Sequence, residues 1–326
     1  MFVVCGEALM DVFAGTETPT GLALDARCGG SPFNLAIGLA RLAQPVAFFG
    51  AVSRDFLGER LMHALRLEGV DTRAAARVPA PTTLSLIGID VHGVPEYSFY
   101  GAGGADRQLT RADLAALDTL PSAIRAVHVG SYTTVVDPIA GTLRALLEAV
   151  PAATVICHDP NVRLNVVPDL ARWREQLEWL LPRVHLLKIS DEDLGLLRPG
   201  VSPAAFAAQA LAHGVSLVVV TRGAKGAQAW TARLAAAGTR VDVPAAAVAV
   251  VDTVGAGDTF QAALLTWLVE HDGLSIDALG ALSALALQDA LTFAAQAAAI
   301  TCARRGADLP RRAELVAEVN LRAPNE

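Results

Sequence analysis

The chain has 326 residues, of which 53% are hydrophobic and 18% are charged, and its formal net charge at pH 7 is -7. A composition this apolar supplies a large buried core and excludes an intrinsically disordered chain. The acidic balance, without any basic run, argues against a nucleic-acid-binding surface. The length suits one large α/β domain or two smaller ones.

The cysteines and the apolar segments indicate where such a protein works. No two cysteines form a C-x-x-C pair, so neither a zinc site nor a disulfide framework is indicated. The first ten residues are apolar but include Glu7 and no basic segment, which is typical of a first strand and not of a signal peptide. The longest other apolar stretch, 291–303, is too short to cross a membrane. We therefore expect a soluble, cytoplasmic protein.

Apolar strand-like runs alternate with helical patterns along most of the chain. This alternation is typical of a parallel sheet with crossover helices. The expected strands, apolar throughout as in sheets buried on both faces, are 2–5, 46–52, 126–129, 154–158, 185–189 and 216–221. The expected helices include 32–42, 57–68, 139–149, 203–212 and 259–271.

Two stretches interrupt this alternation. Residues 11–28 are rich in glycine and threonine and look irregular, whereas 82–100 alternate around a turn at 90–93, which is a hairpin signal. Antiparallel pieces near the start of a parallel α/β domain suggest a small sheet that stands over its face as a lid. Ligands of such domains bind at the carboxyl ends of the strands.

Polar residues follow the first strand and open the first helix. Asp11 could accept hydrogen bonds from two adjacent hydroxyls of a polyol, although a turn aspartate has the same pattern. Ser31 as N-cap and Pro32 in the first turn make a strong helix start. The two glycines before them leave the backbone open to a ligand, and Asn34 presents a donor and an acceptor from the first turn. A capped helix without a ligand fits equally well.

Three later strand ends carry further polar groups. The segment 158–163, H-D-P-N-V-R, ends on Arg163, whose guanidinium suits a phosphate or a carboxylate. Residues 191–193, D-E-D, could form the outer sphere of Mg²⁺, or simply the acidic first turn of a helix. The segment 220–226, V-T-R-G-A-K-G, is a strand followed by a glycine turn that could hold a nucleotide.

The strongest signal is the segment 251–260, V-D-T-V-G-A-G-D-T-F. Its two glycines allow a tight turn, after which the amides of Ala256, Gly257 and Asp258 should point unpaired from a helix N-terminus, which is a site for an anion. An aspartate in an anion site acts against its local field, and this conflict suggests catalysis. The alternative is that Asp258 only caps the helix.

In this order the segments G-E-x-L-x-D, G-G-x-x-x-N, G-x-V-x-x-D-x-x-G, D-P-N-x-R, T-R-G-x-K-G and D-T-V-G-A-G-D-T-F resemble the ribokinase-like (pfkB-type) carbohydrate kinases. The resemblance extends to 301–307 and is greatest to bacterial fructokinases. It implies one three-layer α/β/α domain over 1–326 with a mostly parallel central sheet. A small β-sheet lid would be formed by two insertions, approximately 11–28 and 82–101.

The resemblance also implies roles. Asp258 would be the base that accepts the proton of the sugar hydroxyl, and its helix N-terminus should favour the ionised carboxylate and make it a weak base. An anion hole would consist of Gly255, Ala256 and Gly257. The implied sugar-binding residues are Asp11, Gly29, Gly30, Asn34, Tyr100, Arg163 and Asp258. The implied ATP-binding residues are Asn161, Ser190, Thr221, Gly223, Gly226, Gly255 and Gly257.

The implied cofactors are ATP, Mg²⁺ and K⁺. Mg²⁺ would be held through water by Asp193, although Ser190 and Asp193 replace the Asn and Glu of the N-x-x-E pattern of the family. A monovalent cation, commonly K⁺, would lie by Asp252. Sugar and ATP would be the partners, with neither nucleic acid nor membrane, and the lid could form a homodimer contact.

The activity that follows is transfer of the γ-phosphoryl group of ATP to a hydroxyl of a ketose, with fructose as the first candidate. A 2-keto-3-deoxygluconate kinase is the alternative, but relatives of that kind meet the substrate carboxylate with an arginine after the lid tyrosine, where this chain has Gly101. Another sugar or nucleoside kinase, or a catalytically inactive sugar-binding regulator, also stays open. A regulator would have lost Asp258 or an anion-hole glycine, and this chain keeps both.

Overall fold

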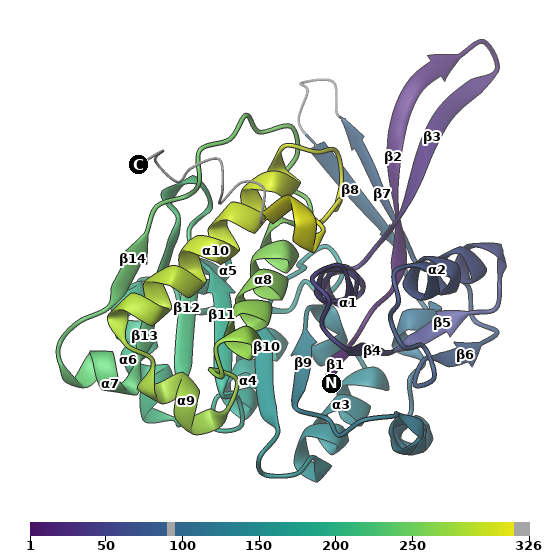
Figure 1. Ribbon diagram of the computed structural model, residues 1–326. Helices are drawn as coiled ribbons and strands as arrows, with labels where there is room; N and C mark the ends of the chain where they lie inside the picture. Colours follow the sequence, from purple (N-terminus) through teal and green to yellow (C-terminus); the bar gives the residue numbers. More distant parts are fainter. Residues whose placement is uncertain (90–94, 316–326) are drawn as a thin grey trace.

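The computed structural model describes residues 1–89 and 95–315. At its centre is a mostly parallel sheet of eight strands (Figure 1). The strand order is β14-β13-β12-β11-β10-β9-β1-β4. The strands are β1 (Phe2–Cys5), β4 (Val46–Phe49), β9 (Ala126–Gly130), β10 (Val155–Asp159), β11 (Leu186–Ser190), β12 (Leu217–Thr221), β13 (Ala227–Thr231) and β14 (Val241–Val243). All neighbours from β4 to β12 pair in parallel.

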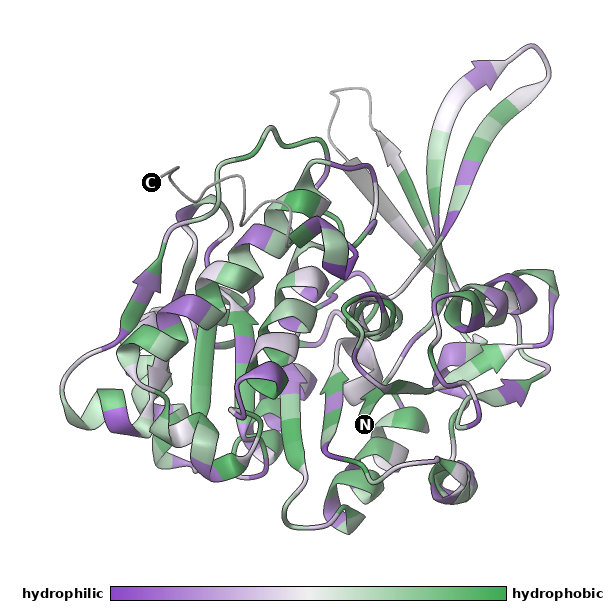
Figure 2. Cartoon of the chain, viewed as in Figure 1, coloured by the Kyte–Doolittle hydropathy of each residue, from purple (hydrophilic) through white to green (hydrophobic). Residues whose placement is uncertain are grey.

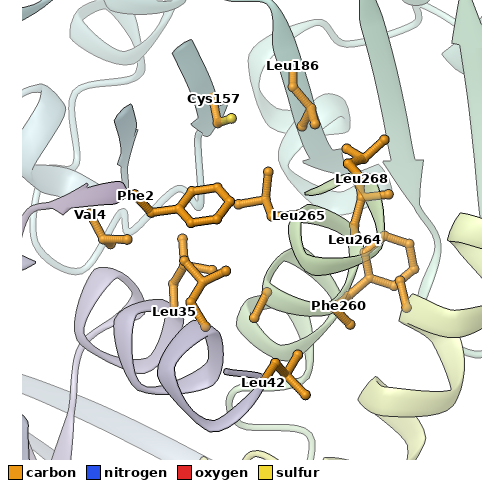
Figure 3. Close-up of a cluster of buried hydrophobic side chains, with 14 of the residues drawn as sticks. Phe2, Val4, Leu35, Leu42, Cys157, Leu186, Phe260, Leu264, Leu265 and Leu268 are labelled. Carbon is orange, nitrogen blue, oxygen red and sulfur yellow. The ribbon is translucent and has the colours of Figure 1, made fainter. Parts of the chain in front are cut away.

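Helices cover both faces of this sheet and make three layers. Side chains alternate along each buried strand, so Phe2 and Val4 face one cluster while Val3 and Cys5 face another. The first cluster is closed by α1 (Ser31–Arg41), α8 (Ala256–Glu270) and α10 (Ala284–Cys302), and Figure 3 shows its centre around Phe2, Leu35 and Leu265. The second is closed by α3 (Ile139–Ala149), α4 (Leu170–Leu180), α5 (Asp191–Leu197) and α6 (Pro203–Ala212). Figure 2 shows the mostly hydrophobic strands between them. The α/β/α architecture is confirmed.

The edge of the sheet beyond β12 is antiparallel, because a short turn can join only antiparallel strands. The 3₁₀ helix η4 (Gly223–Lys225) makes that turn between β12 and β13. The remaining α-helices are α2 (Phe56–Leu67) and the short α7 (Ala232–Ala236) and α9 (Ile276–Ala281), each with buried residues in the first cluster. The other 3₁₀ helices are η1 (Ala105–Arg107), η2 (Arg111–Thr119) and η3 (Tyr132–Thr134).

A second, four-stranded sheet forms the lid, in the order β3-β2-β7-β8. Its strands are β2 (Leu9–Thr18), β3 (Gly21–Gly29), β7 (Leu84–Ile89) and β8 (Pro95–Tyr100). Residues 11–28 were expected to be irregular. That expectation was wrong, because these residues form the β2–β3 hairpin, which projects from the body (Figure 1). Parallel pairing of β2 with β7 supplies the order that the local sequence lacks. The turn expected at 90–93 lies outside the described residues.

The single strand expected at 46–52 was also wrong, since the chain leaves the main sheet at Gly50. A Cβ at Gly50 would collide with the backbone oxygen of Gly6, so only glycine fits where the two strand ends meet. The strand β5 (Ala51–Ser53) then pairs with β6 (Ala76–Val78) instead. The other expected strands, and the helices that end before 213, agree with the structure to within one residue.

The apolar C-terminal segment is longer than expected. The helix α10 has 19 residues, and among the described residues it is long and apolar enough to cross a membrane by length and composition. Its side chains Leu287, Leu291, Ala294 and Ala297 are buried in the cluster that it shares with α8. A core helix has this packing, and the same composition is common in such helices.

Candidate active site

A cleft of about 1070 Å³ lies where the lid sheet meets the carboxyl ends of the central strands. Leu9, Asp11, Ser85 and Phe99 line it from the lid side, and residues after β10, β11 and β12 line it from the central sheet. This is the edge at which parallel α/β sheets bind ligands. The site residues expected from distant parts of the sequence are therefore mostly brought to one place.

Asp258 lies in this cleft, in the first turn of α8, and the start of α1 fixes its carboxylate. The Ser31 hydroxyl donates to Oδ1 at 2.6 Å, and the Asn34 side-chain amide donates to Oδ2 at 2.9 Å. Ser31 was expected to be the N-cap of α1, but the N-cap is Gly30 and makes no side-chain capping bond. The Ser31 hydroxyl is directed across the helix pair to Asp258 instead.

Two glycines allow the helix starts to approach the ligand. Gly30 has φ 107°, and a Cβ there would lie 2.8 Å from the backbone oxygen of Glu7. Gly255, the N-cap of α8, has φ 77°, and a Cβ there would lie 2.6 Å from Cβ of Ala307. Residues that carry a side chain rarely adopt positive φ values of this size. Both positions therefore require glycine for backbone shape and for space.

The amides at the start of α8 are only partly free. The amide of Ala256 donates to the Thr253 carbonyl at 3.2 Å, so it closes the turn and was wrongly expected to be unpaired. Within residues 1–89 and 95–315, the amides of Gly255, Gly257 and Asp258 have no protein acceptor, and those of Gly257 and Asp258 are adjacent in α8. Two adjacent free donors at a helix N-terminus form an anion site.

Burial raises the pKa of Asp258 above its ordinary value, and the hydrogen bonds from Ser31 and Asn34 lower it by less. The expectation that the helix N-terminus would make Asp258 a weak base was therefore wrong. Loss of water around a buried carboxylate disfavours its charged form. The side chain is a stronger base than an exposed aspartate.

The sugar-binding residues expected from the sequence divide into three groups. Asp11, Gly30, Asn34 and Arg163 line the cleft together with Asp258. Gly29 packs against the Asp11 carboxylate, where any Cβ would collide with it. Tyr100 is 63% exposed and does not line the cleft, whereas its neighbour Phe99 does, because successive strand residues point to opposite faces.

Asp11 lies in an environment that penalises its charge. Burial raises its pKa to about 6, a hydrogen bond with Ser85 and the charge of Arg163 lower it, and the charge of Asp258 raises it. Asp11 and Asp258 line the same cleft, in which a hydroxyl group could donate a hydrogen bond to either carboxylate. This arrangement favours a neutral polyol over an anion.

The residues expected to bind ATP line the other end of the same cleft. These are Asn161, Ser190, Thr221, Gly223, Gly226, Gly255 and Gly257. Small apolar side chains from 245–250 and from α10 complete this end. Apolar walls with few polar groups suit the base of a nucleotide.

Asp193 and Asp252, the expected metal-binding residues, have different surroundings. Asp193 lines the cleft, and burial raises its pKa to about 6. Asp252 does not line the cleft; its Oδ1 accepts from the Val254 amide at 3.0 Å and its Oδ2 from the Gly306 amide at 2.8 Å. Among the described residues, no cluster of three or more His, Cys, Asp or Glu side chains could hold a metal ion by itself.

Sequence reasoning missed two charged residues in the cleft. Glu7 is buried at its base, where burial raises the pKa to about 7. Lys188 lies in β11 and pairs with Asp159 at 2.6 Å. A signal was available for both, because Glu7 interrupts the apolar first ten residues and Lys188 interrupts an apolar strand. Burying an unpaired charge costs free energy.

Comparisons with known proteins show what the whole chain is similar to. Residues 1–313 match the family model of the pfkB family carbohydrate kinases. A fructokinase of Rhizobium leguminosarum bv. trifolii is 37% identical over 268 residues, which cover 82% of this chain and 79% of that protein.

Solved structures share the fold over almost the whole chain. The structure of a fructokinase from Xylella fastidiosa with bound ATP has a TM-score of 0.85 at 24% identity and covers 98% of both chains. That of a fructokinase from Vibrio cholerae O395, in a form with fructose, ADP and calcium ion bound, has a TM-score of 0.76 at 26% identity and covers 97% of both chains.

Proposed function

The chain belongs to the pfkB family of carbohydrate kinases, and from that premise we infer that its cleft transfers the γ-phosphoryl group of ATP to fructose. The observation that carries this inference is the carboxylate of Asp258, held by Ser31 and Asn34 beside the two free amides of α8. A base and an anion site thus occupy adjacent positions between a polar end and an apolar end of one cleft.

The reaction follows from this arrangement. A sugar hydroxyl at the lid end attacks the γ-phosphorus while its proton passes to Asp258, and the bond from that phosphorus to the bridging oxygen of ADP breaks. Negative charge on the transferring group is met by the amides of Gly257 and Asp258, which are already oriented and need no rearrangement. Most of the catalysis in phosphoryl transfer is positioning and charge stabilisation of this kind.

The cations of the reaction are proposed from the donors that are present. Mg²⁺ prefers oxygen ligands, keeps several waters and takes one or two carboxylates, so Asp193 fits an outer-sphere role at the phosphate end. The Mg²⁺ ion would supply positive charge to the ATP phosphates. The related Vibrio cholerae fructokinase was solved with a calcium ion. K⁺ is proposed for the loop that Asp252 ties to Gly306, since a cation there would lie beside the start of α8.

Fructose is favoured over 2-keto-3-deoxygluconate by charge. The sugar end is lined by three acidic residues, Glu7, Asp11 and Asp258, so a substrate carboxylate would add a further acidic group there. The arginine that a keto acid needs after Tyr100 is replaced by Gly101, whose Cβ position is blocked by neighbouring side chains. An inactive regulator is disfavoured because the base and both donors are in place.

The test is an ADP-release assay over fructose, 2-keto-3-deoxygluconate, ribose, glucose and adenosine, with and without K⁺ and Mg²⁺. Fructose should give the highest kcat/KM. Turnover of the keto acid with fructose inert would replace the proposed substrate by the alternative. No turnover of any of them, with sugar binding retained, would favour the regulator.

The surroundings of the enzyme are part of the proposal. We propose that the enzyme works in the cytoplasm, where ATP is supplied. All four cysteines are free thiols, as expected in a reducing compartment; they are Cys5, Cys28, Cys157 and Cys302.

We also propose a homodimer contact through the lid, where Leu22 and Leu24 of the projecting β3 strand are more than half exposed. Sedimentation of the wild type against Leu22→Ser tests the contact.

A further inference from the structure

Lys188 is a buried cation in the floor of the cleft. Its side chain is 5% exposed, and its Nζ donates to Oδ2 of Asp159 at 2.6 Å. Because side chains alternate along β11, Lys188 shares the face of Leu186, which is the face covered by α8, while Leu187 and Ile189 point to the other cluster. The ammonium is thus directed toward the helix that carries Asp258.

The ammonium lies against the anion site itself. A Cβ built on Gly257 would be 3.0 Å from Nζ of Lys188, so this nitrogen approaches the backbone whose amide is free. The charge of Lys188 also lowers the pKa of Asp258, although burial has the larger, opposite effect. One cation and two unpaired amides therefore converge on one position in the cleft.

The ion pair with Asp159 does not account for this placement. A lysine ammonium has three donors, and within residues 1–89 and 95–315 Nζ makes one hydrogen bond, the one to Asp159. Buried ion pairs contribute little net stability, because removing both charges from water costs about as much as their attraction returns. A buried lysine with unused donors beside free amides is expected where an anion binds.

We propose that Lys188 binds the transferring phosphoryl group together with the amides of Gly257 and Asp258, and that Asp159 fixes the position of its ammonium. This role rests on the proposed kinase function. Charge on the phosphoryl oxygens is met by a full positive charge in a site with little water, where electrostatic stabilisation is strong. The proton transfer to Asp258 and the bond changes at phosphorus stay as described above.

The experiment compares Lys188→Met with the double variant Lys188→Met/Asp159→Asn, and uses Arg66→Met as control. Arg66 is an exposed cation in α2 and does not line the cleft. Lys188→Met should lower kcat about 10²–10³-fold, with the Kd values of fructose and ADP within a few-fold of wild type. The double variant should be as slow as Lys188→Met, because the Lys188 ammonium is still absent from the phosphoryl group.

A purely structural role predicts the opposite result for the double variant. If Lys188 only neutralises Asp159, removing both charges restores kcat to within a few-fold of wild type, and the proposal is overturned. The double variant also keeps the test valid if Lys188→Met alone does not fold, because it leaves no buried charge unpaired.

A second measurement needs no turnover. ADP with aluminium fluoride mimics the transferring phosphoryl group, so wild type should bind it more tightly than ADP in the presence of fructose. In the double variant this preference should fall about 10²-fold or more. An unchanged preference would overturn the role of Lys188. Failure of the wild type to phosphorylate any sugar would instead overturn the proposed function.

Discussion

Nδ2 of Asn34 lies 2.9 Å from Oδ2 of Asp258, so two residues 224 positions apart in the chain form one unit at the meeting point of α1 and α8. Ser31 holds the other carboxylate oxygen from the same helix turn. Because both oxygens are held, the direction of the base depends on how these two helices pack, and their contact is part of the central core.

Asp258→Asn should lower kcat by about 10²–10⁴-fold, since the amide cannot accept the hydroxyl proton. The KM for fructose should change little, because Asn can still accept from Ser31. The measurement is steady-state kinetics, with Asp289→Asn on the exposed side of α10 as the matched control. Turnover near that of the control would contradict the role of Asp258 as base.

The pH profile should report the environment of Asp258. Its pKa is raised by burial, so kcat should fall as the pH decreases through a value above that of an exposed aspartate. Ser31→Ala removes a hydrogen bond that lowers this pKa, and should therefore move the acidic limb of kcat to higher pH. A limb that stays in place, or moves to lower pH, would show that another group limits kcat.

Asp11→Asn should raise the KM for the sugar by about 10–100-fold while the KM for ATP is unchanged. Hydrogen bonds to a charged group contribute about 1.5–3 kcal/mol each, and about 1.4 kcal/mol corresponds to a factor of ten. In the wild type, kcat/KM for fructose should also decrease below about pH 6, where Asp11 becomes protonated. An equal rise in both KM values would place Asp11 outside the sugar site.

Gly257→Ala should lower kcat by about 10–100-fold, because the new methyl group would lie 3.0 Å from Nζ of Lys188 and displace groups at the anion site. The melting temperature should stay the same or rise, since Gly257 is helical without positive φ and alanine favours a helix. Gly195→Ala in α5, where a Cβ meets nothing within 4 Å, is the control. A stable variant with full activity would show that a methyl group at position 257 does not disturb the anion site.

Glu7→Gln should stabilise the protein at neutral and higher pH. Burial raises the folded-state pKa of Glu7 to about 7, so the folded chain binds a proton more tightly than the unfolded chain. The stability that this group contributes is full below its ordinary pKa and is lost as the pH rises through 7. Glutamine stays neutral and avoids that loss, which approaches about 3 kcal/mol, since each pKa unit is worth about 1.4 kcal/mol.

Urea unfolding of Glu7→Gln and wild type at pH 5, 6, 7 and 8 measures this difference. The gain in free energy of unfolding should increase with pH. Exposed Glu148 in α3 provides the control substitution Glu148→Gln. A gain that is constant with pH would mean that Glu7 stays protonated, or stays ionised, throughout.

The parts of the fold with a strong local pattern could be predicted from the sequence. Buried strands such as β12 and capped helices such as α6 have short-range signals, and their bounds agree to within one residue. The β2–β3 hairpin has no such signal: it is ordered by pairing with β7, more than sixty positions away, which local reasoning does not see.

The same limit applies to the candidate site. The segment around Asp258 could be found because two glycines and an aspartate are adjacent. Ser31 was expected to cap its own helix, and only the packing of α1 on α8 shows that its hydroxyl reaches Asp258. The place of Lys188 beside Gly257 could not be predicted, because it depends on two elements that are distant in sequence.

The cleft draws its two ends from different parts of the chain. With the exception of Arg163, Asp258 and their neighbours, the sugar end is built by residues 7–132, and the nucleotide end by residues 159–302. Under the proposed assignment, acceptor choice is encoded mainly in the first part of the gene and nucleotide chemistry in the later part. An exchange of the first 132 residues between relatives would carry over a new acceptor preference wherever the contact of Ser31 and Asn34 with Asp258 is kept.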